Sequence, residues 1–193
     1  MPQVTKTLII LNVAAYLVQL TGGDALVVQF ALWPLGPLFA PWQVVTYAFL
    51  HGSPTHLFFN MLGLFMFGSD VERLWGTKRY LTYYAVSVLS AAAAQLAVEA
   101  LSGIQAPTIG ASGGVFGLLL AFALYFPHRR VVLLFPPIPM PAWVFALLYG
   151  GLELFLGVTG SAGGVAHFAH LGGMAGGYVL IRTWRSGSGR RRW

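Results

Sequence analysis

Polar side chains suited to acyl transfer occur in three separate apolar stretches of the chain. His56 and Asn60 lie four residues apart, Ser112 follows Gly110 by two positions, and His170 precedes a run of small residues. A serine hydroxyl is a poor nucleophile until a base removes its proton, and a neutral imidazole is suited to that task. Polar groups inside a bilayer are costly, so each of these calls for an explanation. The combination predicts a pair in which Ser112 is the nucleophile and His170 the general base.

The same residues offer hydrogen-bond donors to a developing oxyanion. His56 and Asn60 have the i, i+4 spacing that puts two side chains on one helix face. Ser112 lies near an expected helix start, where free backbone N–H groups and the helix dipole favour an anion. The Asn60 amide, the His56 ring and the Ser112 N–H are therefore predicted to form an oxyanion hole. No acid is expected at the right depth on the right helices, so the sequence predicts a dyad rather than a triad.

Composition identifies the medium in which these groups work. The chain has 193 residues, of which 57% are hydrophobic and 8% charged, against ~25% charged in soluble domains. That composition excludes an ordinary soluble protein, a disordered chain and a nucleic-acid binder, and it predicts a polytopic protein in contact with the lipid bilayer. Cysteine is absent, which excludes a disulfide framework, a thiolate zinc site and a cysteine nucleophile.

Six apolar segments approach the ~20 residues needed to cross a bilayer, and they cover 5–21, 55–74, 79–101, 110–127, 139–158 and 165–185. With the N-terminus inside, all 11 Lys and Arg residues fall on the cytoplasmic side, as the positive-inside rule requires. The four prolines between residues 21 and 55 favour a partly embedded loop with short helical pieces. We therefore predict an all-α, six-helix membrane domain over 1–185, a basic cytoplasmic tail over 186–193, and both termini in the cytoplasm.

Small residues are expected to bring the fourth and sixth spans together. Gly113 and Gly117 lie close to Ser112 in sequence, whereas Gly173 and Gly177 follow His170 at i+3 and i+7. Faces without side chains let membrane helices approach closely. All four glycines are predicted to line this contact, which would bring the Ser112 hydroxyl to about 3 Å from the imidazole, the usual distance between nucleophile and base.

Two further residues leave alternatives open. His167, one helical turn from His170, is a second candidate base, although its rotation directs it toward water, the outer loop or a neighbouring helix. His167 and His170, with His51 and His56 nearby in the outer half, also allow a zinc site. Glu153, the acid expected mid-membrane, is either a protonated packing residue or part of a lateral gate or a pH-sensitive element.

Three motifs together resemble those of the rhomboid intramembrane serine proteases. GASG at 110–113, followed by GVFG at 114–117, is similar to the family's GxSG motif. HLFFN at 56–60 matches its HxxxN, and HLGG at 170–173 with Gly177 resembles its histidine and small-residue helix. The resemblance covers nearly the whole chain. GxSG alone is weakly informative, but the three motifs on spans two, four and six are highly specific together.

The resemblance implies roles for particular residues. Ser112 would be the nucleophile and His170 the base, with oxyanion donors from His56, Asn60 and the Ser112 N–H. It also implies that no metal or cofactor is needed and that the partners are transmembrane protein substrates cut near the outer membrane face. We expect a multi-pass protein of the bacterial cytoplasmic membrane. The sequence departs from the family at Gln43, where many members have Arg, and at Phe116, where many have Tyr; the Phe116 ring is still expected to stack on the His170 imidazole.

Two other classes of function compete with this interpretation. A catalytically silent rhomboid-like scaffold would have lost Ser112 or His170, and both are present. A small transporter or metal-binding membrane protein would carry several intramembrane acids, and Glu153 alone meets that description. The protease interpretation is therefore favoured.

Overall fold

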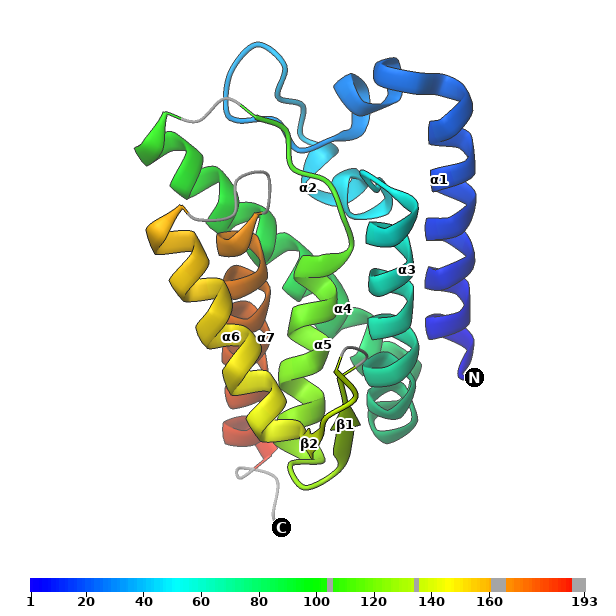
Figure 1. The fold of residues 1–193 in the computed structure, drawn as a ribbon, viewed down its shortest axis with the longest axis vertical. Coiled ribbons are helices and arrows are strands. Elements are labelled where there is room, and N and C mark those ends of the chain that lie inside the picture. The colour runs from blue at the N-terminus through cyan, green and yellow to red at the C-terminus, as the bar shows by residue number, and fades with distance from the viewer. Residues whose placement is uncertain (104–105, 134–135, 161–165, 189–193) are drawn as a thin grey trace.

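The computed structural model describes residues 1–103, 106–133, 136–160 and 166–188, and these form a bundle of helices (Figure 1). Helix α1, Gln3–Phe30, contains a non-helical residue, Gly23, at φ 57° and ψ −148°. Figure 1 shows α1 in blue running beside α3 and then bending near its top. The buried residues of α1 recur every three or four positions and form one stripe toward the bundle: Thr5, Leu8, Asn12 and Tyr16.

The proline-rich connection after α1 contains short helical pieces, as predicted. Helix α2, Gln43–Thr46, continues into a 3-10 turn over Tyr47–Phe49. Gln43 is buried, and its side chain forms hydrogen bonds with backbone groups of the same loop. Its side-chain oxygen Oε1 accepts from the backbone N–H of Ala40 at 3.1 Å, and its side-chain nitrogen Nε2 donates to the backbone carbonyl of Leu38 at 3.0 Å. Gln43 thus supplies local contacts at the position where the sequence departs from the family.

The second and third predicted spans belong to one long helical run. Helix α3, Pro54–Gly63, passes through a π-helical turn at Leu64–Gly68 into helix α4, Ser69–Ser102. The run begins sharply because the Ser53 hydroxyl accepts from the His56 N–H at 3.0 Å and proline occupies the first helical position. Gly76 interrupts α4 at φ 74°, a conformation that favours glycine. The interruption lies between the two predicted spans.

Helix α5, Ser112–Tyr125, is buried on most of its sides. Helix α6, Ala142–Thr159, and helix α7, His167–Ser188, lie together beside it in Figure 1. Strands β1, Arg130–Val132, and β2, Pro139–Pro141, pair antiparallel with Val131 opposite Met140. They form a hairpin between α5 and α6. Helix α7 continues to Ser188, whereas residues 189–193 of the predicted tail lie outside the described residues.

The outer surface of the bundle is apolar, as expected in lipid. Helices α1 and α6 and the run Pro54–Ser102 are long and apolar enough to cross a membrane, and α5 is a shorter apolar helix. Large side chains on α1 and α6 are more than half exposed, among them Leu17, Leu20, Leu147 and Val158. Contiguous apolar surface of this extent is unfavourable in water. The described residues therefore have the character of an integral membrane protein.

Glycines let α7 pack closely against its neighbours, although not entirely as predicted. A Cβ on Gly173 would collide with the backbone carbonyl of Gly113, and one on Gly117 would lie 3.2 Å from the Gly173 carbonyl oxygen. Gly113, Gly117 and Gly173 therefore line the expected contact of the fourth and sixth spans, although a Cβ on Gly113 or Gly117 would first meet Ala91 or Ser87 of α4. Gly177 instead faces Tyr83 and Ser87 of α4. Its expected place on the α5 contact is wrong, because α7 lies in the angle between α4 and α5 and presents a small residue to each.

Candidate active site

Ser112 is the first residue of α5, and the loop before it is fixed by backbone hydrogen bonds. Leu32 and Thr108 exchange two such bonds at 3.0 and 2.8 Å, and the Gly110 N–H donates to the Tyr47 carbonyl at 2.9 Å. Gly110 adopts φ 127°, and a Cβ there would lie 2.7 Å from Cε1 of His56. Both the backbone and the adjacent ring therefore require glycine. This turn brings the Ser112 side chain next to His56.

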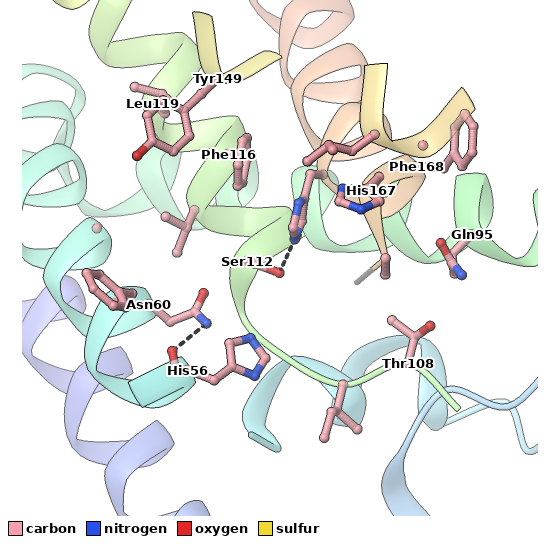
Figure 2. A pocket seen from close by; sticks show the side chains of 18 of the residues that line it. His56, Asn60, Gln95, Thr108, Ser112, Phe116, Leu119, Tyr149, His167 and Phe168 are labelled. Atoms are coloured by element: carbon pink, nitrogen blue, oxygen red, sulfur yellow. Dashed lines mark hydrogen bonds between the residues drawn. The ribbon is translucent and has the colours of Figure 1, made fainter. Parts of the chain in front are cut away.

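The Ser112 hydroxyl contacts the imidazole of His170. Its Oγ lies 2.7 Å from the His170 Nε2, a hydrogen bond drawn in Figure 2. Phe116, four residues after Ser112 and on the same face of α5, stacks on the His170 ring with centroids 4.4 Å apart and planes 5° from parallel. One helix thus supplies both the hydroxyl and the ring that orients its partner. The structure brings these three predicted residues together in the expected way.

His56 and Asn60 lie across the same cavity from His167 in Figure 2, with Ser112 between. The His56 Nδ1 accepts from the Gly52 N–H at 3.3 Å, so the hydrogen bond assigns the ring proton to Nε2. This Nε2 is the atom near Gly110 and therefore points toward the site. Asn60 donates through Nδ2 to the His56 carbonyl at 3.0 Å. That bond fixes the amide and uses one of its two N–H groups.

The cavity that contains these residues has a volume of about 1190 Å³. His56, Asn60, Ser112 and His170 line it. Apolar side chains also line the cavity. Among them are Phe59 of α3, Met66 of the π-helical turn and Tyr149 of α6. The space therefore extends from the polar cluster to apolar residues of α3 and α6.

His51 supports the site from the loop before α3. It is buried, and its ring lies 5.1 Å from that of His56 and 6.5 Å from that of Tyr16. Burial, followed by the charge of neighbouring His56, lowers the pKa of His51 to about 4. Gln19 of α1 fixes its backbone, because the His51 N–H donates to Gln19 at 3.0 Å and its carbonyl accepts at 2.9 Å. His51 is thus a neutral packing partner of His56 near neutral pH.

Glu153 of α6 lies in the same layer, contrary to the sequence prediction. Its Oε2 is 2.6 Å from Nδ1 of His167 and 2.8 Å from Nδ1 of His170. The expectation that no acid lies at the right depth on the right helices is wrong, because α6 carries Glu153 to both imidazoles. Counted from Ala142, where α6 begins, Glu153 lies about 17 Å along the helix, similar to the depth expected for His170. His167 faces a neighbouring helix, one of the three directions expected for it, because its buried side chain contacts Glu153 of α6.

Among the described residues, a metal ion could be held by donor atoms of Glu153, His167 and His170. These atoms lie within 4.8 Å of one another. The set differs from the predicted one, which contained His51 and His56. Ligands at about 2.1 Å around tetrahedral zinc lie roughly 3.4 Å apart. The nitrogen–oxygen distances of 2.6 and 2.8 Å are shorter. The two histidines are therefore closer to the carboxylate than two ligands of one tetrahedral zinc ion would be.

Comparisons with known proteins indicate the family to which the chain belongs. The Rhomboid domain family matches residues 39–186. The chain is 33% identical over 133 residues to the mitochondrial Rhomboid protein 1 of Saccharomyces cerevisiae, a match that covers 68% of this chain and 38% of that protein. It is 27% identical over 189 residues to the rhomboid protease GlpG of Yersinia pestis, covering 93% of this chain and 62% of the relative.

The fold and the site together define a helical integral membrane protein with a polar cavity that contains a serine. The chain belongs to the rhomboid family, and the resemblance carried by its three motifs is confirmed. The chain spans less than two thirds of the length of these two relatives.

Proposed function

We propose that this chain is an intramembrane serine protease that cleaves transmembrane proteins near the outer membrane face. The observation that carries the proposal is the 2.7 Å contact between Ser112 Oγ and His170 Nε2 inside the cavity. A hydroxyl hydrogen-bonded to a neutral imidazole, with the ring held by stacking, is the arrangement of an activated nucleophile. Membership of the rhomboid family supports the same activity.

The reaction would proceed through an acyl-enzyme. Ser112 Oγ attacks the carbonyl carbon of the scissile peptide while its proton passes to Nε2 of His170. The carbonyl oxygen becomes an oxyanion, and when the tetrahedral intermediate collapses the C–N bond breaks and His170 returns the proton to the leaving amine. Water then attacks the ester with His170 again acting as base, which releases the new carboxyl group and restores Ser112.

The oxyanion would bind between the start of α5 and the start of α3. The first N–H groups of a helix have no intrahelical acceptor, and here they belong to Ser112 and its neighbours. His56 directs its Nε2 toward Gly110, beside the Ser112 hydroxyl. Asn60 supplies its remaining amide N–H. These donors would stabilise charge that appears only as the reaction proceeds, which is the most effective use of such groups.

The oxyanion assignment predicts that Asn60→Ala and His56→Ala each lower kcat by about 10²-fold, the usual effect of one lost donor. His56→Ala is expected to cost at least as much as Asn60→Ala, because its ring also fills the space beside Gly110. Cleavage of a model transmembrane substrate in detergent measures both. Wild-type kcat in the two variants would show that the oxyanion binds elsewhere.

Substrates would enter beside α6. The cavity reaches from the polar cluster to Tyr149 and Leu156 of this helix, whose outer face exposes Leu147, Phe155 and Val158. A transmembrane helix can pack on such a face without leaving the lipid. Its unwound end would then extend along the cavity toward Ser112.

The topology proposed for this chain has six spans with both termini in the cytoplasm. The supporting observation is that all 11 Lys and Arg residues then lie inside. In a bacterium the membrane would be the cytoplasmic one. Reporter fusions after Gly103 are expected to be external and fusions after Arg130 internal. An external C-terminus would contradict this topology.

The proposed function is tested by covalent labelling of the purified protein with a fluorophosphonate probe. Wild-type protein should be labelled, and mass spectrometry should place the adduct on Ser112, because an activated serine is required for the reaction. Ser112→Ala is the control for labelling at other sites. A folded wild-type protein that neither takes up the probe nor cleaves a transmembrane substrate would instead fit a silent scaffold.

A further inference from the structure

We propose that Glu153 is a positioning residue that holds His170 in the protonation form required of a general base, which extends the Ser112–His170 pair to a triad. The inference rests on the proposed function. Its basis is the carboxylate itself, whose Oε2 lies 2.8 Å from His170 Nδ1 while His170 Nε2 lies 2.7 Å from Ser112 Oγ. The imidazole is thus placed between an acid and a hydroxyl, one at each ring nitrogen.

The packing of α6 against α7 brings the carboxylate to this position. Gly150 and Gly157 lie at i−3 and i+4 from Glu153, and therefore on the same face of α6. A Cβ on Gly157 would lie 3.2 Å from the Cβ of His167, and one on Gly150 would lie 3.4 Å from Met174. The small residues on both sides of Glu153 let the helices approach, so the acid reaches two imidazoles of α7 with its side chain buried.

The carboxylate determines which nitrogen of His170 carries the proton. An ionised carboxylate only accepts hydrogen bonds, so it favours the ring form with hydrogen on Nδ1. The Nε2 lone pair then faces the Ser112 hydroxyl and can accept its proton. After the transfer, the positively charged ring lies beside a negative charge. Glu153 would therefore act before the proton transfer by orienting the ring and during it by stabilising the imidazolium, as the acid does in serine protease triads.

The two contacts of Glu153 differ in quality. Its contact with His167 is a hydrogen bond of 2.6 Å, whereas His170 Nδ1 has the short distance without the alignment of a hydrogen bond. Catalytic hydrogen bonds are often poorly aligned before substrate binds and tighten during the reaction. His167 would accordingly anchor the carboxylate, and the weaker contact with His170 would improve as the ring becomes charged.

The Glu153→Gln variant distinguishes two roles of Glu153. One is to position the His170 ring, and the other is only to support the contact between α6 and α7. The amide oxygen of glutamine can still accept from His167, but the charge beside His170 is lost. We expect kcat to fall on the order of 10²-fold with KM unchanged, less than the ~10⁴-fold cost of disabling the acid of a fully aligned triad. His167→Ala removes the anchor and keeps the charge, so its loss in kcat should be smaller. Glu72→Gln is the matched control, because Glu72 is a buried acid of α4 that accepts hydrogen bonds from Val4 and Thr5 and does not line the cavity.

Steady-state cleavage of a transmembrane substrate, with thermal unfolding measured on the same samples, decides between the two roles. Wild-type kcat in Glu153→Gln would overturn the proposal. So would equal losses in Glu153→Gln and His167→Ala, since a shared structural role predicts equality. A fall in kcat that is confined to Glu153→Gln, at unchanged KM and unfolding temperature, supports positioning.

A second measurement does not depend on proteolysis. Nitrogen-15 NMR of labelled histidines distinguishes the two neutral ring forms, and the His170 signal is assigned by its loss in His170→Ala. We expect hydrogen on Nδ1 in the wild-type protein and a shift toward Nε2 in Glu153→Gln. Hydrogen on Nε2 in the wild-type protein would overturn the proposal even if the protein is an active protease. Missing fluorophosphonate labelling would count against the proposed function instead.

Discussion

Ser112→Ala and His170→Ala are each expected to reduce cleavage of a transmembrane substrate to background, and the double variant should lose no more than either alone. Members of a nucleophile–base pair act as a unit, so each single loss is on the order of 10⁵-fold or greater and the losses do not add. The reason lies in the 2.7 Å contact, which is absent from all three variants. Single-turnover cleavage in detergent, with the double variant as baseline, measures the effect.

The two histidines of α7 provide the internal control. His170→Ala should also abolish fluorophosphonate labelling at neutral pH, because Ser112 is then without a base. His167→Ala keeps the Ser112–His170 contact, and it should keep labelling and most turnover with a stability loss of about 1–2 kcal/mol from the missing hydrogen bond. Normal labelling of His170→Ala beside an unlabelled His167→Ala would reverse the assignment of the base.

Gly173→Ala is expected to produce the second large effect, through packing alone. The added Cβ would collide with the carbonyl of Gly113, a neighbour of Ser112, while Gly173 itself lies one turn from His170. Helices α5 and α7 would have to separate, and a misplacement of ~1 Å between reacting groups can cost ~10²-fold in rate. The rate of substrate cleavage should therefore fall well before the protein loses its cooperative thermal unfolding.

Gly151→Ala is the matched control for this packing prediction. A Cβ at Gly151 of α6 would have no neighbour within 4 Å, so the same substitution in a membrane helix should leave fluorophosphonate labelling of Ser112, which needs no packing of a substrate on α6, unchanged. Equal labelling rates in the Gly151 and Gly173 variants would show that α5 and α7 can adjust without disturbing Ser112 and His170.

The Ser112–His170 contact was predictable from sequence because three independent patterns agree on it. The polar residues stand out in apolar segments, the charged ends of the spans give their depth, and the neighbouring glycines indicate which faces meet. Each pattern depends on local spacing along one helix, which sequence displays directly. Gly113, Gly117 and Gly173 accordingly lie where helix periodicity places them.

The contacts of Glu153 and Gly177 depend on helix rotation, which local spacing does not define. Helix α6 carries apolar residues on several faces, so its sequence gives little indication of which face meets α7. Depth counting from Ala142 could have placed Glu153 in the layer of His170, but not the direction of its side chain. Gly177 shows the same limit, since a glycine fits equally well against α4 or α5. Gln43 is similar, because its partners are backbone groups of an irregular loop.

The attachment of α6 to α7 through Glu153 has a consequence for the timing of the reaction. Any outward swing of α6 that admits a substrate would draw the carboxylate away from His170, and the base would lose its counter-charge while the entrance is open. The helix would have to return before proton transfer becomes efficient. Substrate entry and cleavage would then take place at different times. A membrane helix that keeps α6 from returning would leave without being cleaved. Selectivity would in part be kinetic, decided by how long a segment stays rather than by how tightly it binds.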